Sequence, residues 1–340
     1  MPGRFTLSIV SDVHYAGTAE QARGTFFLKA VGHPARRMAL QLYRHFVWQR
    51  DAFAHNHLLD AFIERARASD FVIANGDYSC DSAFVGVCDS PAYESAAECL
   101  QKLRLTFSPR FAATFGDHEL GKKPLGADVG GLRLASYYRA VEGLELAPFW
   151  QYDFGCYTLI GVLSTLLAAP VFEPEMLPSE RANWAALREE HLEKIRRAFS
   201  ALKPNQKVLL FCHDPTALPF LWREPVVREK LGQVERTVIG HLHSSLIYLK
   251  SRLLAGMPII RFLGHTPRRL SIALHDARHW KPFKVLLCPA LAGIELLRDG
   301  GYCVAELDLE GREKAIFRVA RWRSEISTPS KSRASATPGD

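Results

Sequence analysis

Short apolar runs recur along the chain, and five of them end abruptly in polar residues. The runs FTLSIV, DFVIA, RFAATF, KVLLF and RTVI are followed by SDVH, NGD, GDHE, CHD and GHLH, respectively. Runs of this length, rich in β-branched and aromatic residues, predict buried strands. Because helix-like segments lie between them, we expect a layered α/β sandwich. The polar residues then fall at strand ends, where α/β sheets usually carry their ligand sites.

The remaining elements are predicted from periodicity and turn residues. Residues 180–202 place apolar side chains near helical spacing, which predicts one long helix. Residues 151–165 indicate a β-hairpin or two short strands. Residues 283–293 and 300–322 indicate terminal strands that contain one turn.

Two stretches interrupt the alternation of strands and polar ends. Residues 16–59 carry six Lys and Arg against two Asp and Glu, and residues 245–284 carry eight against one. The whole chain has a net charge of +7, so the rest of the chain is net negative. In both insertions basic residues alternate with large apolar ones near helical spacing, which predicts a helical, apolar lid over the body.

The composition is average for a globular protein. Of the 340 residues, 48% are apolar and 23% are charged. No apolar run approaches the roughly 18 residues that span a bilayer, and the start lacks a secretory signal, so we expect a cytoplasmic location. Seven cysteines without CxxC pairs argue against a disulfide framework. Residues 326–340 are rich in Ser, Thr and Pro and are predicted to be disordered, which leaves residues 1–325 as a single domain.

Histidine and aspartate concentrate in the five polar ends. Asp12 and His14 are two residues apart on an extended segment, so their side chains share a face and can reach one ion. His241 and His243 repeat this spacing. Imidazole nitrogens and carboxylate oxygens are common ligands of transition metals. Five such clusters, each after an apolar run, predict a metal site.

The motif series is similar to that of the calcineurin-like metallophosphoesterase family, which reads D-x-H, G-D, G-N-H-[DE], a lone H and G-H-x-H. The chain carries SDVH, NGD, GDHE, CHD and GHLH in this order. The resemblance implies two mixed β-sheets flanked by helices. It also implies a hydrolase of phosphate esters or pyrophosphates.

The same resemblance implies two metal sites that share Asp77. One ion is expected on Asp12, His14, Asp77 and His243, and the other on Asp77, Asp117, His213 and His241. We expect Mn²⁺, with Fe or Zn as alternatives. Two ions roughly 3.5–4 Å apart would activate a bridging hydroxide as the nucleophile. His118 matches the family's catalytic histidine, which stabilises the transition state or protonates the leaving oxygen.

One residue departs from the family pattern, because Asp117 stands where the family usually has Asn. A carboxylate can replace the amide oxygen, but it adds negative charge beside an anionic substrate, which would change metal preference or activity. A metal-bound scaffold or binding module without catalysis is the alternative, and the presence of His118 favours the enzyme. Arg268 and Arg269 are either a clamp for a substrate phosphate or a solvated pair.

The insertions indicate the kind of substrate. Basic charge among large apolar residues suits an anionic amphiphile or a membrane surface. Within the resemblance, the UDP-diacylglucosamine pyrophosphohydrolases of lipid A synthesis pair this core with such a lid. A nuclease or nucleotide phosphodiesterase is the alternative, since phosphate contacts also require basic charge.

Overall fold

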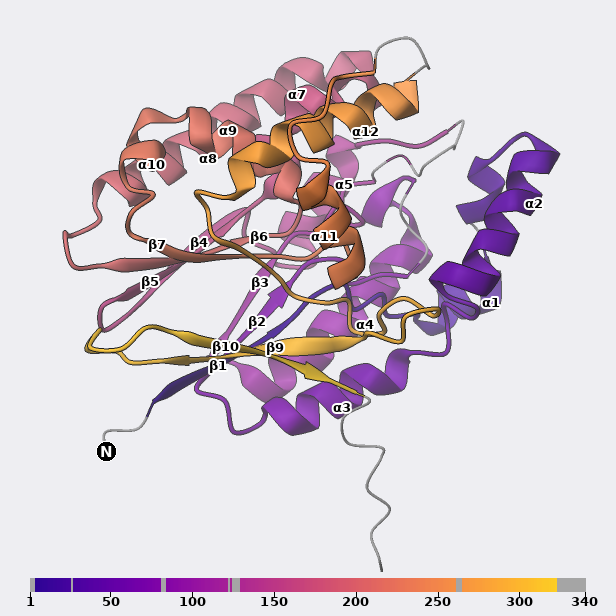
Figure 1. The fold of residues 1–340 in the computed structure, drawn as a ribbon. Coiled ribbons are helices and arrows are strands. Elements are labelled where there is room, and N and C mark those ends of the chain that lie inside the picture. The colour runs from indigo at the N-terminus through magenta and orange to yellow at the C-terminus, as the bar shows by residue number, and fades with distance from the viewer. Residues whose placement is uncertain are drawn as a thin grey trace, which may run out of the picture.

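Two five-stranded sheets lie face to face and form the centre of the molecule (Figure 1). This is a computed structural model, and it describes residues 4–25, 27–80, 84–121, 123, 129–260 and 265–322. The first sheet has the order β10-β9-β1-β2-β3, and the second has the order β4-β5-β6-β7-β8. The strands are β1 (Phe5–Val10), β2 (Phe71–Asn75), β3 (Phe111–Thr114), β4 (Phe149–Phe154), β5 (Tyr157–Val162), β6 (Lys207–Cys212), β7 (Val234–Ile239), β8 (Val285–Leu287), β9 (Gly301–Leu307) and β10 (Ile316–Arg321).

Both sheets are mixed, as the family resemblance implied. Strands β1, β2 and β3 are parallel, whereas β9 runs antiparallel to β1 and to β10. Strands β5 to β8 are parallel, and β4 pairs with β5 as an antiparallel hairpin. The carboxyl ends of the parallel strands within each sheet therefore lie at one edge of that sheet.

Alternation along the strands divides the apolar side chains between two layers. Leu7 and Ile9 of β1 join Leu209 and Phe211 of β6 in the core between the sheets. Their neighbours point the opposite way, because successive side chains of a strand face opposite sides. Val10 thus packs under helices on the outer face of the first sheet. Strands buried on both faces explain why these runs are continuously apolar.

Helices cover the outer face of each sheet. Apolar residues of α3 and α4 pack on the first sheet, and those of α8 and α9 pack on the second. The α-helices are α1 (Thr18–Arg23), α2 (Pro34–Tyr43), α3 (Asn56–Ala66), α4 (Ser90–Phe107), α5 (Leu134–Glu142), α6 (Ser164–Leu167), α7 (Ala169–Phe172), α8 (Arg181–Ser200), α9 (Leu218–Arg223), α10 (Pro225–Glu229), α11 (Ser245–Leu253) and α12 (His265–Asp276). Among the described residues, no helix has both the length and the apolar content needed to cross a membrane.

Shorter helical segments connect these elements. A π-helix, η2 (Arg44–Trp48), continues α2, and the residues that the structure describes also form six 3-10 helices. They are η1 (Phe27–Ala30), η3 (Gly86–Cys88), η4 (Glu173–Glu175), η5 (Pro178–Glu180), η6 (Pro215–Ala217) and η7 (Ala277–Trp280).

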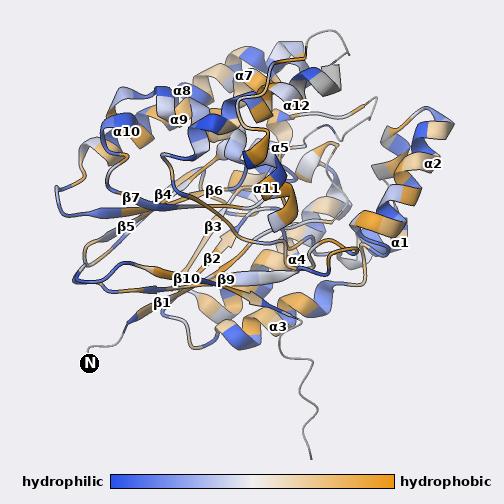
Figure 2. Ribbon diagram, viewed as in Figure 1, coloured by the Kyte–Doolittle hydropathy of each residue, from blue (hydrophilic) through white to orange (hydrophobic). Residues whose placement is uncertain are grey.

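The predicted elements are confirmed, with small shifts at their ends. The five apolar runs are β1, β2, β3, β6 and β7, the long helix is α8, and the hairpin is β4 and β5. Both insertions contain helices, since the first contains α1 and α2 and the second contains α11 and α12. Figure 2 shows apolar and polar residues alternating on α2, which stands away from the sheets. The predicted tail, residues 326–340, lies outside the described part of the chain.

One buried histidine of α8 links stability to pH. His191 is 3% exposed, and its Nε2 accepts a hydrogen bond from the backbone N–H of Leu163 at 3.2 Å. Burial, with smaller contributions from Lys194 and Arg188, lowers the pKa of His191 from 6.5 to about 3. In the unfolded chain His191 therefore binds a proton near pH 6.5, whereas in the folded chain it binds one only near pH 3. Stability from this residue is present above pH 6.5 and is lost progressively as the pH falls.

We expect His191→Gln to remove this pH dependence while keeping an acceptor for Leu163. Between pH 7.5 and 5.5, the wild type should lose about 1.4 kcal/mol of unfolding free energy that the variant keeps. Urea unfolding at both pH values measures the difference, with the exposed His57→Gln as the control. An equal loss in the wild type and in His191→Gln would contradict the assignment.

Candidate metal centre

The structure brings the seven predicted ligands together at one edge of the two sheets. Each follows the carboxyl end of a parallel strand. Parallel strands in adjacent positions end at the same edge of a sheet, so these residues meet there. Asp12 and His14 follow β1, Asp77 follows β2, Asp117 follows β3, His213 follows β6, and His241 and His243 follow β7.

These side chains form two groups of four that share Asp77. Asp12, His14, Asp77 and His243 offer ligand atoms that all lie within 4.8 Å of one another, and so do Asp77, Asp117, His213 and His241. The division matches the two sets that the family resemblance implied.

Individual distances show how tightly the donor atoms converge. His14 Nε2 lies 3.4 Å from His243 Nε2, which in turn lies 3.2 Å from an Asp12 oxygen. His213 Nε2 lies 3.1 Å from Asp77 Oδ2 and 3.2 Å from Asp117 Oδ1. The same Asp117 oxygen lies 3.2 Å from His241 Nδ1. Donor atoms of neighbouring strands therefore point at common centres.

Backbone carbonyls orient two of the imidazoles. His213 Nδ1 lies 2.6 Å from the carbonyl oxygen of Asn75, and His14 Nδ1 lies 3.3 Å from that of Ser79. A hydrogen on Nδ1 that is donated to a carbonyl leaves the Nε2 lone pair free for a metal. Ser11 Oγ donates to Asp12 Oδ2 at 2.6 Å and fixes that carboxylate in the same way.

The carboxylates are buried together and depend on nearby positive charge. Asp12, Asp77 and Asp117 are each at most 3% exposed. Burial raises the pKa of Asp12 above its usual range. Burial alone would also raise the pKa of Asp77, but His213 and His118 hold it below its usual range. Burial would lower the pKa of His213, yet Asp77 and Asp12 raise it well above 6.5.

This donor set fits a pair of metal ions. Buried carboxylates are retained when they are paired with cations or coordinate metals, and isolated buried charges are costly. Three carboxylates and four imidazoles provide oxygen and nitrogen ligands for transition metals. The bridging position of Asp77 suits a dinuclear centre.

The backbone is left-handed at five of the seven ligands. The φ angles are +50° at Asp12, +48° at His14, +60° at Asp77, +60° at His241 and +57° at His243. Non-glycine residues rarely adopt this region, and clusters of such residues mark functional sites. The chain therefore turns sharply after β1, β2 and β7, which aims these side chains into the site.

Two glycines allow the turns to approach one another. A Cβ on Gly116 would lie 2.0 Å from Asp77 Oδ1, and one on Gly76 would lie 2.5 Å from the backbone nitrogen of Gly116. Gly76 also has a φ of +92°. The glycines before Asp77 and Asp117 are thus required by close packing.

Glu119 holds the turn that carries Asp77. It is fully buried and accepts backbone N–H bonds from Gly116 at 2.7 Å, Tyr78 at 2.8 Å and Asp77 at 3.1 Å. Burial and the neighbouring Asp77 raise the pKa of Glu119 to about 7. Its three donors lie on two strand ends, so this carboxylate ties the β2 turn to the β3 turn.

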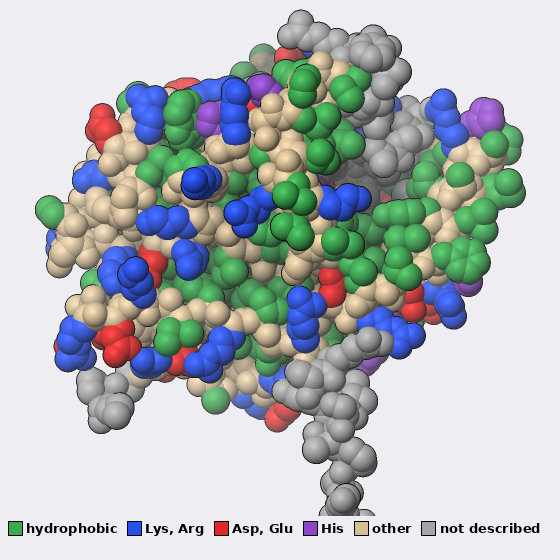
Figure 3. Space-filling model, in the orientation of Figure 1, with side chains coloured by type: hydrophobic (Ala, Val, Ile, Leu, Met, Phe, Trp, Pro, Cys, Tyr) green, Lys and Arg blue, Asp and Glu red, His purple; other side chains and the backbone are tan. Residues whose placement is uncertain are grey.

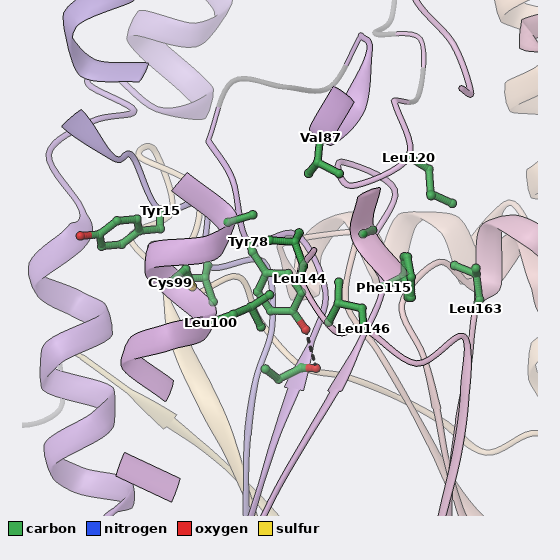
Figure 4. Packing of buried hydrophobic residues seen from close by; sticks show 14 of the residues in the cluster. Tyr15, Tyr78, Val87, Cys99, Leu100, Phe115, Leu120, Leu144, Leu146 and Leu163 are labelled. Atoms are coloured by element: carbon green, nitrogen blue, oxygen red, sulfur yellow. Dashed lines mark hydrogen bonds between the residues drawn. The ribbon is translucent and has the colours of Figure 1, made fainter. Parts of the chain in front are cut away.

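Tyr78 anchors the same turn from the core side. Its ring is fully buried among apolar side chains that include Leu100 and Leu144 (Figure 4). The hydroxyl donates toward the carbonyl oxygens of Thr114 at 2.7 Å and Ala74 at 3.0 Å. Asp77 is therefore fixed between a buried carboxylate and a buried phenol.

His118 lies beside the predicted metal ligands and is partly exposed. Its backbone N–H donates to Asp77 Oδ1 at 3.0 Å, and its Nε2 lies 4.0 Å from Asp77 Oδ2. Its ring centre is 4.7 Å from that of His14. The side chain is 18% exposed and that of His241 is 26%, whereas Asp77 and His213 are closed to solvent. The group of predicted ligands is therefore most accessible to solvent at His241, with His118 beside it.

Trp48 of the first insertion packs on the predicted ligand His243, and the sequence did not predict this contact. The ring centres of Trp48 and His243 are 4.7 Å apart. Backbone bonds from Glu295 to the Trp48 carbonyl, at 2.8 Å, and from Leu296 to the Val47 carbonyl, at 3.1 Å, hold this segment against the body. No motif marks Trp48, so only the folded chain reveals this contact.

The two predicted substrate arginines lie on α12. The Arg268 side chain is exposed, and its carbonyl oxygen accepts a hydrogen bond from Ser271 Oγ. No contact among the described residues joins Arg268 to the seven ligands. The Arg269 side chain lies outside the described part of the structure. A role for this pair in binding phosphate stays a prediction.

The model of the calcineurin-like phosphoesterase family matches residues 5–245. The match covers more than half of the chain, so the chain belongs to this family, and it is a metal-dependent phosphoester hydrolase. No curated protein sequence matches the chain. Among solved structures, the phosphopantetheinyl hydrolase of Mycobacterium tuberculosis is 15% identical, with a TM-score of 0.33, over 72% of this chain and 84% of that one. A likeness of that size carries no conclusion about the substrate.

The carboxylate at position 117 provides a test of the second metal position. We expect Asp117→Asn to keep an oxygen donor but to remove one negative charge between His213 and His241. Affinity for the second ion should fall on the order of tenfold, while the first ion stays nearly unaffected. Stepwise removal of metal with a chelator, followed by elemental analysis, measures both affinities. If both ions leave as they do from the wild type, the negative charge of Asp117 does not strengthen binding of the second ion.

Proposed function

We propose that this chain hydrolyses a phosphate ester or pyrophosphate of an anionic amphiphile at a dinuclear centre. Asp12, His14 and His243 would hold one ion, Asp117, His213 and His241 the other, and Asp77 would bridge them. Mn²⁺ is the expected metal, with Fe or Zn as alternatives. Two such ions polarise a phosphoryl group and supply an activated water as nucleophile.

His118 is the proposed general acid. It contacts Asp77, stands at the exposed side of the centre, and has 18% of its side chain open to an arriving substrate. An imidazole there can donate a proton to the leaving oxygen or hydrogen-bond to the phosphoryl group. Glu119 and Asn75 act at a distance from the substrate, since they hold the Asp77 turn and the His213 ring.

The distribution of exposed apolar residues supports an amphiphilic substrate. Among the described residues, sixteen large apolar side chains are exposed, and nine of them come from the two insertions. They are Met38, Leu42, Tyr43, Phe46, Leu246, Leu249, Leu253, Leu254 and Leu270. Exposed apolar residues concentrated in this way typically mark interaction surfaces. In Figure 3 apolar side chains gather over α2 and over α11.

The segments that carry α11 and α2 both lead to the predicted ligand His243. Ser244, the residue after the predicted ligand His243, caps α11, whereas α2 continues through η2 to Trp48, which contacts the same histidine. Residues 27–50 contain five Lys and Arg and no Asp or Glu. A helix with an apolar face and only basic charges suits an anionic lipid surface. Phosphates presented at such a surface would lie next to the centre.

The identity of the amphiphile is a separate prediction. UDP-diacylglucosamine carries a pyrophosphate and two acyl chains, which matches the proposed chemistry. Release of the cleaved products from this substrate is the direct assay for that specificity.

Replacing His118 tests the catalytic assignment. We expect His118→Ala to lower turnover of an aryl phosphodiester about 10²–10⁴-fold, because general acid catalysis contributes that much. Metal content should stay the same, since His118 is not among the proposed ligands. Elemental analysis and initial rates measure the two effects. Full activity in the variant would remove His118 from the mechanism.

Charged substitutions on α2 and η2 test the amphiphile. We expect Met38→Glu/Phe46→Glu to lower the rate on a phosphate substrate in anionic vesicles about tenfold relative to the rate on a water-soluble aryl phosphodiester. Leu105→Glu is the matched control, because Leu105 is 80% exposed on α4, outside both insertions. An unchanged ratio would reject the membrane surface. Faster cleavage of an oligonucleotide than of any lipid would support a nuclease instead.

A further inference from the structure

A basic pocket lies at the edge of the second sheet, separate from the metal centre. It has a volume of about 360 Å³ and is bordered by α11, η7 and the strands β7 and β8. Five cationic side chains line it, namely Arg236, Arg252, Arg278, Lys281 and Lys284. None of the seven predicted metal ligands is among its lining residues.

The five cations have no carboxylate partners among the described residues. All five are exposed, no carboxylate lines the pocket, and no ion pair involves any of them within the described part of the chain. The nearest acid in sequence, Glu235, alternates with Arg236 along β7, and its carboxylate contacts Lys207 and the backbone N–H of Ala315. Cations gathered without counter-charges repel one another, so an anion is the natural ligand.

The walls of the pocket are fixed by the fold. Lys284 Nζ donates to the carbonyl oxygen of Val234 at 2.6 Å, and Tyr248 Oη donates to that of Val285 at 3.0 Å. The rings of Tyr248 and Trp280 are nearly parallel, at 7°, with centres 6.2 Å apart. The Arg252 guanidinium lies 5.7 Å from the Tyr248 ring centre. Anchored side chains of this kind lose little freedom when a ligand binds.

We propose that this pocket binds a phosphate-bearing anion at a second site. Three guanidinium groups provide planar pairs of donors that match phosphate oxygens, and two ammonium groups add charge. Trp280 is only 6% exposed, so its ring offers little surface for stacking on a base. Recognition therefore rests on the phosphate group. A phospholipid headgroup and a small soluble phosphate ester both carry this chemistry.

Helix α11 places the pocket next to an apolar strip. Leu246, Leu249 and Leu253 recur at intervals of three and four residues and are exposed, whereas Tyr248 and Arg252 line the pocket. Residues at these spacings share one helix face, so α11 has an apolar face and a pocket face. A lipid could place its phosphate in the pocket while its chains lie along the leucines.

Two binding measurements on the metal-loaded protein test the pocket. Inorganic phosphate is titrated while the indole N–H resonance of Trp280, assigned with Trp280→Phe, is followed in the Zn²⁺-loaded form. Binding to phosphatidylcholine vesicles with and without phosphatidic acid is measured by sedimentation. Both compare the wild type with Arg252→Gln/Lys281→Gln. The charge-matched control is Arg312→Gln/Arg318→Gln, on exposed arginines near β10.

For a soluble phosphate ligand, we expect a saturable shift of the Trp280 resonance, with a midpoint at least tenfold higher in Arg252→Gln/Lys281→Gln. For a headgroup ligand, that variant loses at least tenfold in affinity for phosphatidic acid vesicles and the control does not. Arg252→Lys/Lys281→Arg should keep binding, which separates lost charge from misfolding. A Trp280 resonance that phosphate leaves in place, together with vesicle binding equal to that of the control, overturns the proposal. Neither measurement depends on hydrolysis of a substrate. A failure of this proposal can therefore be distinguished from a failure of the proposed function.

Discussion

Three buried carboxylates that meet between two sheet edges are the constraint on which the rest of this structure depends. Asp12, Asp77 and Asp117 come from three adjacent parallel strands of the first sheet, and histidines from the second sheet surround them. Like charges at this distance repel strongly in a medium of low dielectric constant. The arrangement is stable only beside positive charge, which the imidazoles provide in part and bound metal ions would complete.

Backbone hydrogen bonds hold the turns that bring these charges together. The left-handed conformation at five ligand positions costs roughly 1–2 kcal/mol per residue, and the surrounding structure must offset it. Glu119 accepts three backbone N–H groups from two strand ends, and Tyr78 binds two strand carbonyls. The loop after β8 closes the edge, since Ala290 N–H donates to the His243 carbonyl and Leu291 N–H to that of Ser11. The strand ends and the hydrogen bonds between their turns thus determine the geometry of the centre.

The strands and the seven candidate ligands could be predicted from the sequence because both depend on short stretches of neighbouring residues. Apolar runs determine strands, and motifs at strand ends converge wherever parallel strands are adjacent. Contacts made by unmarked residues could not be predicted in this way. Trp48 reaches His243 through the path of an insertion, and the Asn75 carbonyl orients His213 through backbone geometry. The pocket at α11 could not be predicted either, because its cations come from three separate segments, at residues 236, 252 and 278–284, and only the fold brings them together.

The sheets and the insertions carry different parts of the proposed function. The strand ends hold the predicted metal ligands, and the insertions carry the surface proposed to bind the substrate. All seven predicted ligands stand on strand ends, and the first insertion reaches them through the ring of Trp48, which offers no oxygen or imidazole donor. The sheets carry the negative centre, whereas the insertions carry a net positive charge and nine of the sixteen exposed large apolar side chains among the described residues. A phosphate is attracted to the basic insertions and repelled by the carboxylates until metal charge offsets them. If the proposed amphiphile is the substrate, changes on α2 and α11 would alter substrate preference without altering the backbone of the centre.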